Sequence, residues 1–208
     1  ALGPLARVRG RAADIAKRPE MGESGLVGAR DAELKSLMTW FKQEFFVWVN
    51  KPPCEACGVM ADRPRGPKRA IAPGCTPVPV GSDAPRSDAE RAGWAGVVEL
   101  YRCEGARGCG VTTRWPRFNN PATLLETRRG RCGEWANCFC LFARALGFDC
   151  RHVVDFTDHV WAEVWSESAR RWVHADPCEN RLDRPQMYVS AFSEFSEILY
   201  VFPPEVGI

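Results

Sequence analysis

A cysteine at the predicted start of a helix, followed by several short strands, is the feature that most constrains this chain. Residues 127–179 read TRRGRCGEWANCFCLFARALGFDCRHVVDFTDHVWAEVWSESARRWVHADPCE. After Cys132, apolar residues recur at helical spacing, and Gly147 ends the segment as a helix C-terminal glycine does. Runs rich in β-branched and aromatic residues then predict strands at Arg151–Phe156, His159–Trp165 and Arg171–Ala175. The sequence therefore predicts an α+β fold with a helix packed on an antiparallel sheet.

The same stretch carries the residue types of a thiol nucleophile and its helpers. Unpaired N–H groups and the helix dipole at the first turn would favour the thiolate of Cys132. His159 and Asp176 stand at a predicted strand start and strand end, where side chains emerge at the rim of a sheet. His159 would take the thiol proton, while Asp176 would hold the imidazole tautomer. Taken singly, such a cysteine or histidine is more often structural, so the hypothesis rests on their order and setting.

Four segments resemble the core of the cytoplasmic peptide:N-glycanases, members of the transglutaminase-like superfamily. They are GRCGEWANCF, RALGF, DFTDHVWAEVW and RWVHADPCEN, and the likeness runs from about Leu34 to about Tyr188. The resemblance implies a transglutaminase-like (papain-like) core with Cys132 as nucleophile, His159 as base and Asp176 as third member. It also implies a cytoplasmic enzyme of ERAD that hydrolyses the bond between an N-linked glycan and asparagine in misfolded glycoproteins, converting asparagine to aspartate.

An amphipathic helix is predicted over residues 31–48, with Asp31 as its N-cap. One face of this helix is apolar along its whole length. Trp48 closes the apolar stripe, and by the resemblance it lies near the active-site cleft. An indole face stacks well on a sugar ring, which would make Trp48 a substrate-binding residue. Burial in the core is the competing interpretation.

Two cysteine pairs predict a structural zinc site. Cys54 and Cys57 have the usual two-residue spacing, whereas five residues separate Cys103 from Cys109. Four thiolates suit a tetrahedral zinc centre and leave no open position for water, which favours a structural role. The resemblance selects Cys109, and with it Cys103, because the family's second pair precedes a stretch like TTRWPRFNNP. Cys75 is a less favoured ligand, and free thiols are the competing interpretation.

The rest of the sequence predicts one catalytic core with an N-terminal appendage. We expect a helix or arm and a linker in residues 1–30, and the core in residues 31–208 with a zinc-binding subdomain at 50–115. The basic amphipathic segment Leu5–Lys17 is a candidate site for a ubiquitin-linked proteasome shuttle factor, a partner that the resemblance implies; a solvated helix or flexible arm is the alternative. The proline-rich segment 61–93 is predicted to be an irregular loop, and Glu197–Phe202 a strand.

Composition excludes several classes of protein. The 208 residues carry 28 Lys+Arg against 26 Asp+Glu, a balance that does not indicate a nucleic-acid partner. No apolar run is long enough to predict a membrane span, and the N-terminus lacks the apolar core of a secretory signal. In an intracellular enzyme, ten cysteines indicate metal binding or catalysis rather than disulfides. We expect a monomer.

Two other functional classes share these features. A catalytically silent binding module of the same fold is conceivable, because the superfamily includes a damage-recognition protein of DNA repair that lost the triad. The intact Cys132, His159 and Asp176 set argues against that reading. A thiol protease or a transglutaminase would use the same triad, and only the substrate cleft would distinguish them.

Overall fold

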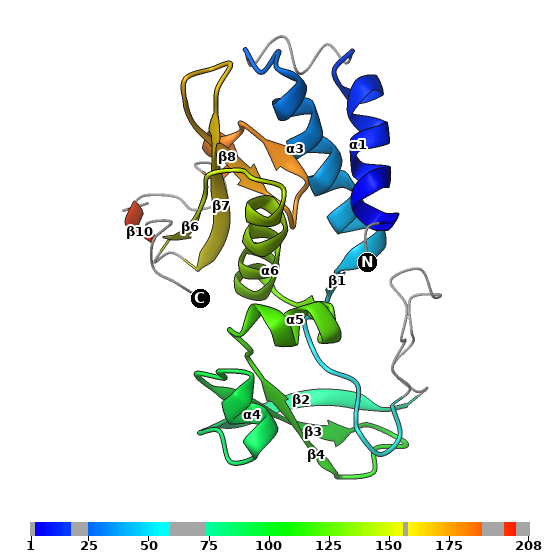
Figure 1. Ribbon diagram of the computed structural model, residues 1–208. Helices are drawn as coiled ribbons and strands as arrows, with labels where there is room; N and C mark the ends of the chain where they lie inside the picture. The colour runs from blue at the N-terminus through cyan, green and yellow to red at the C-terminus, as the bar shows by residue number, and fades with distance from the viewer. Residues whose placement is uncertain (1–2, 18–24, 59–73, 156–157, 189–197, 203–208) are drawn as a thin grey trace. The chain divides into compact units, whose positions relative to one another are not determined.

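The computed structural model describes residues 3–17, 25–58, 74–155, 158–188 and 198–202 (Figure 1). The chain divides into two compact units. The first unit combines Ala1–Phe45 with Trp135–Ile208, and the second is Phe46–Glu134. Within the described ranges, no helix is long and apolar enough to cross a membrane.

An antiparallel sheet forms the centre of the first unit. In the part of the chain that is described, its spatial order is β10-β6-β7-β8-β9. The strands are β6 (Cys150–Asp155), β7 (His159–Ser166), β8 (Arg171–Asp176), β9 (Arg181–Leu182) and β10 (Ile198–Phe202). The bounds predicted for β6, β7 and β8 agree to within one residue at each end, although Phe156 lies outside the described residues, as does Glu197 before β10. The α+β prediction is confirmed.

Helix α6 (Cys132–Ala145) begins at the cysteine that the sequence placed there. From Trp135 onward it contributes buried residues to the first unit, among them Phe139, which is fully buried. Phe41 packs edge-on against both rings, with centroid separations of 5.6 Å to Trp135 and 5.7 Å to Phe139. Gly147 ends the helical run at φ +78°, a backbone conformation that favours glycine. The predicted stop at this residue is confirmed.

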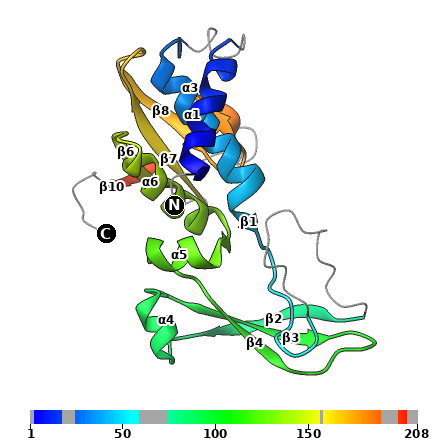
Figure 2. The same cartoon turned by 45° about the vertical axis from the view of Figure 1, so that its right-hand side comes forward.

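Two helices pack side by side in the first unit, α1 (Gly3–Ile15) and α3 (Ala29–Trp40) (Figures 1 and 2). The hydroxyl of Ser36 donates to the backbone carbonyl of Val8 at 2.6 Å, and both residues are fully buried. Arg9 on α1 forms an ion pair of 2.9 Å with Glu33 on α3. The predicted N-terminal helix is therefore present, and it is docked on α3.

The prediction of one helix over residues 31–48 with Asp31 as N-cap was wrong at both ends. The N-cap is Gly28, whose N–H donates to the Asp31 carboxylate at 3.0 Å. Asp31 therefore lies inside the first turn, where it also accepts the hydroxyl of Ser166 at 2.8 Å. The helix proper ends at Trp40 and passes into a π-helical turn, Phe41–Phe45. Side-chain periodicity could not detect either feature, because both depend on backbone hydrogen bonding.

The chain after this turn belongs to the second unit and is extended. Strand β1 (Val47–Trp48) pairs in parallel with β5 (Arg129–Gly130). The N–H of Val47 donates to the carbonyl of Arg128 at 2.9 Å. Val47 and Trp48 are of the β-branched and aromatic types that favour strands, and this pairing overrides the helical pattern expected there.

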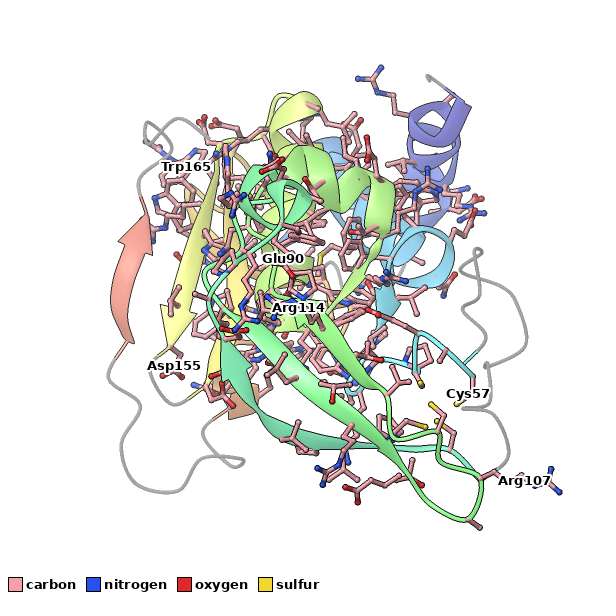
Figure 3. The ribbon with its side chains drawn as sticks, turned by 90° about the horizontal axis from the view of Figure 1, so that it is seen from below. Cys57, Glu90, Arg107, Arg114, Asp155 and Trp165 are labelled. Atoms are coloured by element: carbon pink, nitrogen blue, oxygen red, sulfur yellow. The ribbon has the colours of Figure 1, made fainter. Side chains whose placement is uncertain are left out.

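A second antiparallel sheet, in the order β2-β3-β4, forms the body of the second unit. Its strands and the helices around it are β2 (Thr76–Asp83), α4 (Asp88–Ala92), β3 (Val98–Glu104), β4 (Thr112–Pro116) and α5 (Pro121–Thr127). Arg114 on β4 forms an ion pair of 2.8 Å with the buried Glu90 on α4 (Figure 3). This contact ties the short helix to the sheet.

The expectation of an irregular loop over residues 61–93 was wrong for its second half. Thr76–Asp83 is a strand and Asp88–Ala92 a helix, whereas residues 61–73 lie outside the described residues. Strand β2 lies at the end of the described strand order, and proline is tolerated on edge strands. The helix begins with a capping box in which Ser87 and Glu90 each accept the other's backbone N–H, at 3.1 and 3.0 Å.

Candidate active site and metal centre

His159 and Asp176 are in direct contact in the first unit. Nε2 of His159 lies 2.8 Å from Oδ2 of Asp176, although 17 positions separate the two residues in the sequence. His159 opens β7 and Asp176 ends β8, and these strands are antiparallel neighbours. Antiparallel pairing brings the start of one strand beside the end of the next. Asp176 is fully buried, and the side chain of His159 is 16% exposed.

The Asp176 carboxylate is held by hydrogen bonds at both oxygens. Oδ1 accepts the backbone N–H groups of Cys178 at 2.7 Å and Glu179 at 3.1 Å. Oδ2 accepts the hydroxyl of Tyr188 at 2.7 Å in addition to its contact with His159. Burial raises the pKa of Asp176, but the hydrogen bonds outweigh burial and hold this pKa below its ordinary value. Asp176 is therefore a carboxylate at neutral pH.

Tyr188 links this carboxylate to a second histidine, which the sequence analysis missed. The hydroxyl of Tyr188 lies 2.7 Å from Nε2 of His174. Because Tyr188 gives its proton to Asp176, it accepts the Nε2–H of His174, and Nδ1 of His174 accepts the N–H of Arg184 at 3.4 Å. Burial lowers the pKa of His174 to about 4, which keeps the ring neutral. One sequence signal existed: His174 and Asp176 are two residues apart on a strand and share a face.

Aromatic rings shield this hydrogen-bond chain. Trp161 lies nearly parallel to Tyr188, with ring centroids 5.0 Å apart, and to His159, with centroids 5.9 Å apart. Trp161 and Tyr188 are buried together with Val153 in one cluster. An apolar neighbourhood strengthens hydrogen bonds within it, so the orientation of His159 is well defined.

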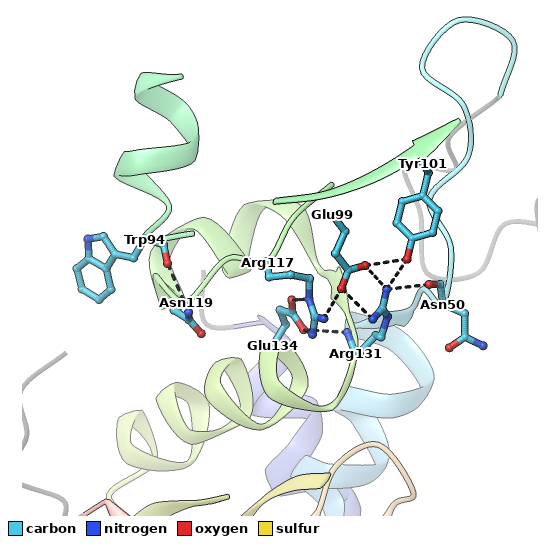
Figure 4. A network of polar contacts seen from close by, with 8 residues as sticks. All are labelled: Asn50, Trp94, Glu99, Tyr101, Arg117, Asn119, Arg131 and Glu134. Carbon is cyan, nitrogen blue, oxygen red and sulfur yellow. Dashed lines mark hydrogen bonds and ion pairs between the residues drawn. The ribbon is translucent and has the colours of Figure 1, made fainter. Parts of the chain in front are cut away.

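A network of ion pairs surrounds the start of α6 in the second unit (Figure 4). The backbone N–H of Arg131, just before Cys132, donates to Oε2 of Glu134 at 3.0 Å, so Glu134 caps the helix from its first turn. Arg117 donates to both oxygens of Glu134, at 2.5 and 2.9 Å, and to Glu99 at 2.9 Å. Arg131 closes the network through two bonds to Glu99, at 3.1 and 2.5 Å.

Two further groups fix the Arg131 side chain. Nη2 of Arg131, which also donates the shorter bond to Glu99, donates to the hydroxyl of Tyr101 at 2.9 Å and to the carbonyl of Asn50 at 3.0 Å. A Cβ on Gly130 would lie 2.5 Å from the Cβ of Glu134, so only glycine at position 130 allows the capping approach. Arg131 directly precedes Cys132, but the partners in this network lie far apart in the sequence, so no local pattern predicts it. The structure thus holds the half-buried Cys132 at a rigid helix start.

Five cysteine sulfurs gather in the second unit, close to Cys57 in Figure 3. The sulfurs of Cys54, Cys57, Cys75 and Cys103 all lie within 4.8 Å of one another, and Cys109 lies 3.4 Å from Cys54. Sulfurs bound at about 2.3 Å to one tetrahedral ion are about 3.8 Å apart, so this set fits a metal ion. The structure thus gathers the four cysteines predicted from the two pairs and adds Cys75.

Trp48 is 44% exposed, and its indole N–H donates to Oδ1 of Asn50 at 2.8 Å. Burial in the core, the competing interpretation for this residue, is contradicted by that exposure. Its role in binding sugar stays a prediction.

Comparison with known proteins adds a family and named relatives. A sequence model of the transglutaminase-like superfamily matches residues 82–177. The chain is 43% identical over 189 residues to a peptide-N(4)-(N-acetyl-beta-glucosaminyl)asparagine amidase of Gallus gallus, an alignment that covers 90% of this chain and 26% of that protein. Proteins of the same name from Arabidopsis thaliana and Homo sapiens are 44% identical over 163 residues and 41% identical over 186 residues. These alignments cover 78% and 89% of this chain, but only 20% and 26% of the relatives.

Proposed function

The chain belongs to the transglutaminase-like superfamily, and we propose that it hydrolyses the bond between an N-linked glycan and asparagine in denatured glycoproteins. The observation that carries this proposal is the hydrogen-bonded pair of His159 and the buried Asp176 on neighbouring strands, in a chain whose relatives are named as amidases of this bond. The chain spans about a quarter or less of the length of those relatives. The proposed activity is therefore assigned to the segment of those relatives that aligns with this chain.

The proposed reaction has two steps. The thiolate of Cys132 attacks the side-chain carbonyl carbon of the glycosylated asparagine, forming a thioester and expelling the glycosylamine, which takes a proton from His159. Water then gives a proton to His159 and attacks the thioester, which frees aspartate and restores the thiolate. The backbone N–H of Cys132, in the first turn of α6, is a candidate donor to the oxyanion.

The remaining polar groups would act by positioning. Asp176 accepts the Nε2–H of His159, so proton exchange with the thiol and the leaving group would run through Nδ1. Tyr188 holds the carboxylate that holds the ring. Glu134 and Arg131 fix the helix start that carries the nucleophile.

The cysteine cluster would hold a structural zinc ion. Thiolates are the ligands that zinc prefers in closed sites, and a site with four of them has no position for a reacting water. Cys54, Cys57 and Cys103 would supply three sulfurs, and either Cys109, as the resemblance implies, or Cys75 would supply the fourth. When bound, the ion would join the segment before residue 59 to the β2-β3-β4 sheet. It would take no part in the hydrolysis.

Substrate contacts and partners extend the proposal. The exposed indole of Trp48 would stack on a sugar ring of the glycan. Helix α1, whose Arg9 side chain is 66% exposed, would offer a basic surface to a ubiquitin-linked proteasome shuttle factor. A thiol nucleophile and a thiolate metal site both need reduced cysteine, which suits the cytoplasm. We propose that the protein acts there as a monomer in the degradation of misfolded glycoproteins.

Product analysis on three substrates tests this function. The purified chain is incubated with a denatured N-glycopeptide, with the same peptide lacking the glycan, and with a glutamine peptide plus an amine donor. We expect turnover of the glycopeptide alone, with aspartate at the former glycosylation site. Backbone cleavage would instead indicate a thiol protease, and amine incorporation a transglutaminase. Glycopeptide binding without turnover would indicate a silent binding module.

A further inference from the structure

We infer that Cys75, rather than Cys109, is the fourth ligand of the metal, so that a strand outside both cysteine pairs closes the site. The inference rests on the metal site proposed above and is independent of the proposed hydrolysis. Neither the regular spacing of Cys54 and Cys57 nor the sequence around Cys109 points to Cys75. Three features of the structure do.

The first feature is the mutual distance of the sulfurs. Cys75 belongs to the set in which every sulfur lies within 4.8 Å of every other. Its sulfur lies 2.7 Å from that of Cys103, and Cys57 lies 3.4 Å from Cys103. A tetrahedral ion with bonds of about 2.3 Å separates its sulfur ligands by about 3.8 Å. The set therefore needs only about 1 Å of widening at its closest pair to accept the ion.

The second feature is burial. Cys54, Cys75 and Cys103 are only 2–5% exposed and form one buried cluster, with Cys57 packed against it. Cys109 is exposed, although its sulfur lies 3.4 Å from that of Cys54. Three thiols packed together away from water are placed to share one metal ion. Cys109 lies at the rim of the cluster.

The third feature is how the backbone holds Cys75. The residues after it enter β2, whose Pro77 is opposite Cys103 in the register with β3. The residue before it, Gly74, accepts the N–H of Arg107 through its carbonyl at 3.0 Å. At Gly105, φ is +104°, and a Cβ there would lie 2.6 Å from that carbonyl oxygen. The turn after Cys103 is thus folded around Gly74.

This contact also explains the unusual spacing of the second pair. The turn that contacts Gly74 lies among the five residues between Cys103 and Cys109, near Arg107 at the end of the sheet in Figure 3. A turn with only two residues between the cysteines would be too short to form the contact with Gly74. The five intervening residues therefore hold Gly74, and with it Cys75, close to the turn after Cys103, while Cys109 at the end of the turn is exposed.

Cobalt substitution tests the assignment by spectroscopy. The full chain is stripped of metal and loaded with Co²⁺, and the sulfur-to-cobalt charge-transfer absorption is compared among the wild type, Cys75→Ser and the matched variant Cys109→Ser. The intensity of this band follows the number of thiolates bound to cobalt, which falls from four to three only if the substituted cysteine is a ligand. We expect Cys75→Ser to lose about a quarter of the band and Cys109→Ser to retain it. Zinc affinity, from competition with a chromogenic chelator, should fall at least about tenfold in Cys75→Ser and stay within about twofold in Cys109→Ser.

The experiment still distinguishes Cys75 from Cys109 if Cys75→Ser fails to fold, because the band of Cys109→Ser and the thiol labelling of the wild type do not depend on that variant. Iodoacetamide should label Cys109 in the zinc-loaded wild type and should label Cys75 only after the metal is removed. Loss of the band in Cys109→Ser, protection of Cys109 by zinc, or a wild type without a thiolate band would overturn the inference. So would a Cys75–Cys103 disulfide in the zinc-loaded protein. None of these results bears on whether the protein hydrolyses glycopeptides, which is measured separately.

Discussion

The hydroxyl of Tyr188 donates a hydrogen bond of 2.7 Å to Oδ2 of Asp176, the oxygen that His159 also contacts. The sequence predicts Cys132, His159 and Asp176 for the reaction, and the structure adds a hydrogen bond from Tyr188 that holds the Asp176 carboxylate. The neutral ring of His174 completes the chain by donating to the Tyr188 oxygen. The orientation of His159 therefore depends on a chain of hydrogen bonds that continues beyond Asp176 to Tyr188 and His174.

Tyr188→Phe should raise the pKa of Asp176, because it removes one of the hydrogen bonds that favour the carboxylate. The acid limb of the kcat/KM profile for glycopeptide hydrolysis should then move to higher pH, while KM changes little. The phenyl ring keeps the stacking with Trp161. Met187→Leu, which packs against the same cluster without a hydrogen bond to Asp176, is the control. An unchanged pH profile in Tyr188→Phe would show that the hydroxyl has no positioning role.

Glu134→Gln should destabilise the start of α6. The guanidinium of Arg117 donates two bonds to the Glu134 carboxylate, and the variant removes the negative charge of that partner. Breaking a buried ion pair costs roughly 3 kcal/mol, whereas an exposed pair is worth about 1 kcal/mol or less. Urea unfolding should therefore separate Glu134→Gln from Glu104→Gln, which breaks an exposed pair with Arg102. Equal losses in the two variants would contradict the role of the network.

Acid should destabilise the first unit through two histidines, the buried His174 and the half-buried His152. Burial lowers the pKa of both His152 and His174 to about 4, below the ordinary value of 6.5. Between these values the unfolded chain binds protons that the folded chain does not, so stability is complete above pH 6.5 and falls as the pH drops towards 4. At pH 5 each histidine should cost about 2 kcal/mol. Urea unfolding at pH 7 and pH 5 measures the loss, and His152→Asn should reduce it; a free energy independent of pH would contradict the assignment.

Metal removal should unfold the second unit. A closed thiolate site contributes to folding directly, so a strong chelator should abolish the cooperative thermal transition of this unit rather than only lower activity. Elemental analysis before the treatment should find about one zinc per chain. Serine at Cys54 or Cys57 should mimic the chelator. An unchanged transition after complete metal removal would rule out a structural role.

Much of the first unit could be predicted because its signals are local. Helical spacing and Gly147 marked α6, and β-branched and aromatic runs marked β6, β7 and β8. The second unit was harder to predict, because its contacts join residues distant in the sequence. Strand β2 was hidden by its prolines, which an edge strand accommodates. The position of Cys75 follows from the pairing of β2 with β3, which no local pattern encodes.

Contacts between residues distant in the sequence also explain which parts of the candidate site the sequence does not predict. Cys132, His159 and Asp176 lie in distinctive segments, so the sequence was sufficient to propose them. Tyr188 contacts Asp176 across 12 positions, and Arg117 reaches Glu134 across 17. Pairs of this kind become visible only once the fold has brought them together.

We propose that Cys132 acts as the nucleophile of an amidase on N-glycosylated asparagine, and this role can be measured. Its most direct test is mass spectrometry of a denatured N-glycopeptide after incubation with the wild type and with Cys132→Ala, both shown to be folded and equally loaded with zinc. The wild type should release the glycan and leave aspartate at the glycosylation site, whereas Cys132→Ala should do neither. Glycan release by Cys132→Ala at the wild-type rate would show that Cys132 is not the nucleophile, and no release by the folded, zinc-loaded wild type would show that the chain is not an amidase of this bond.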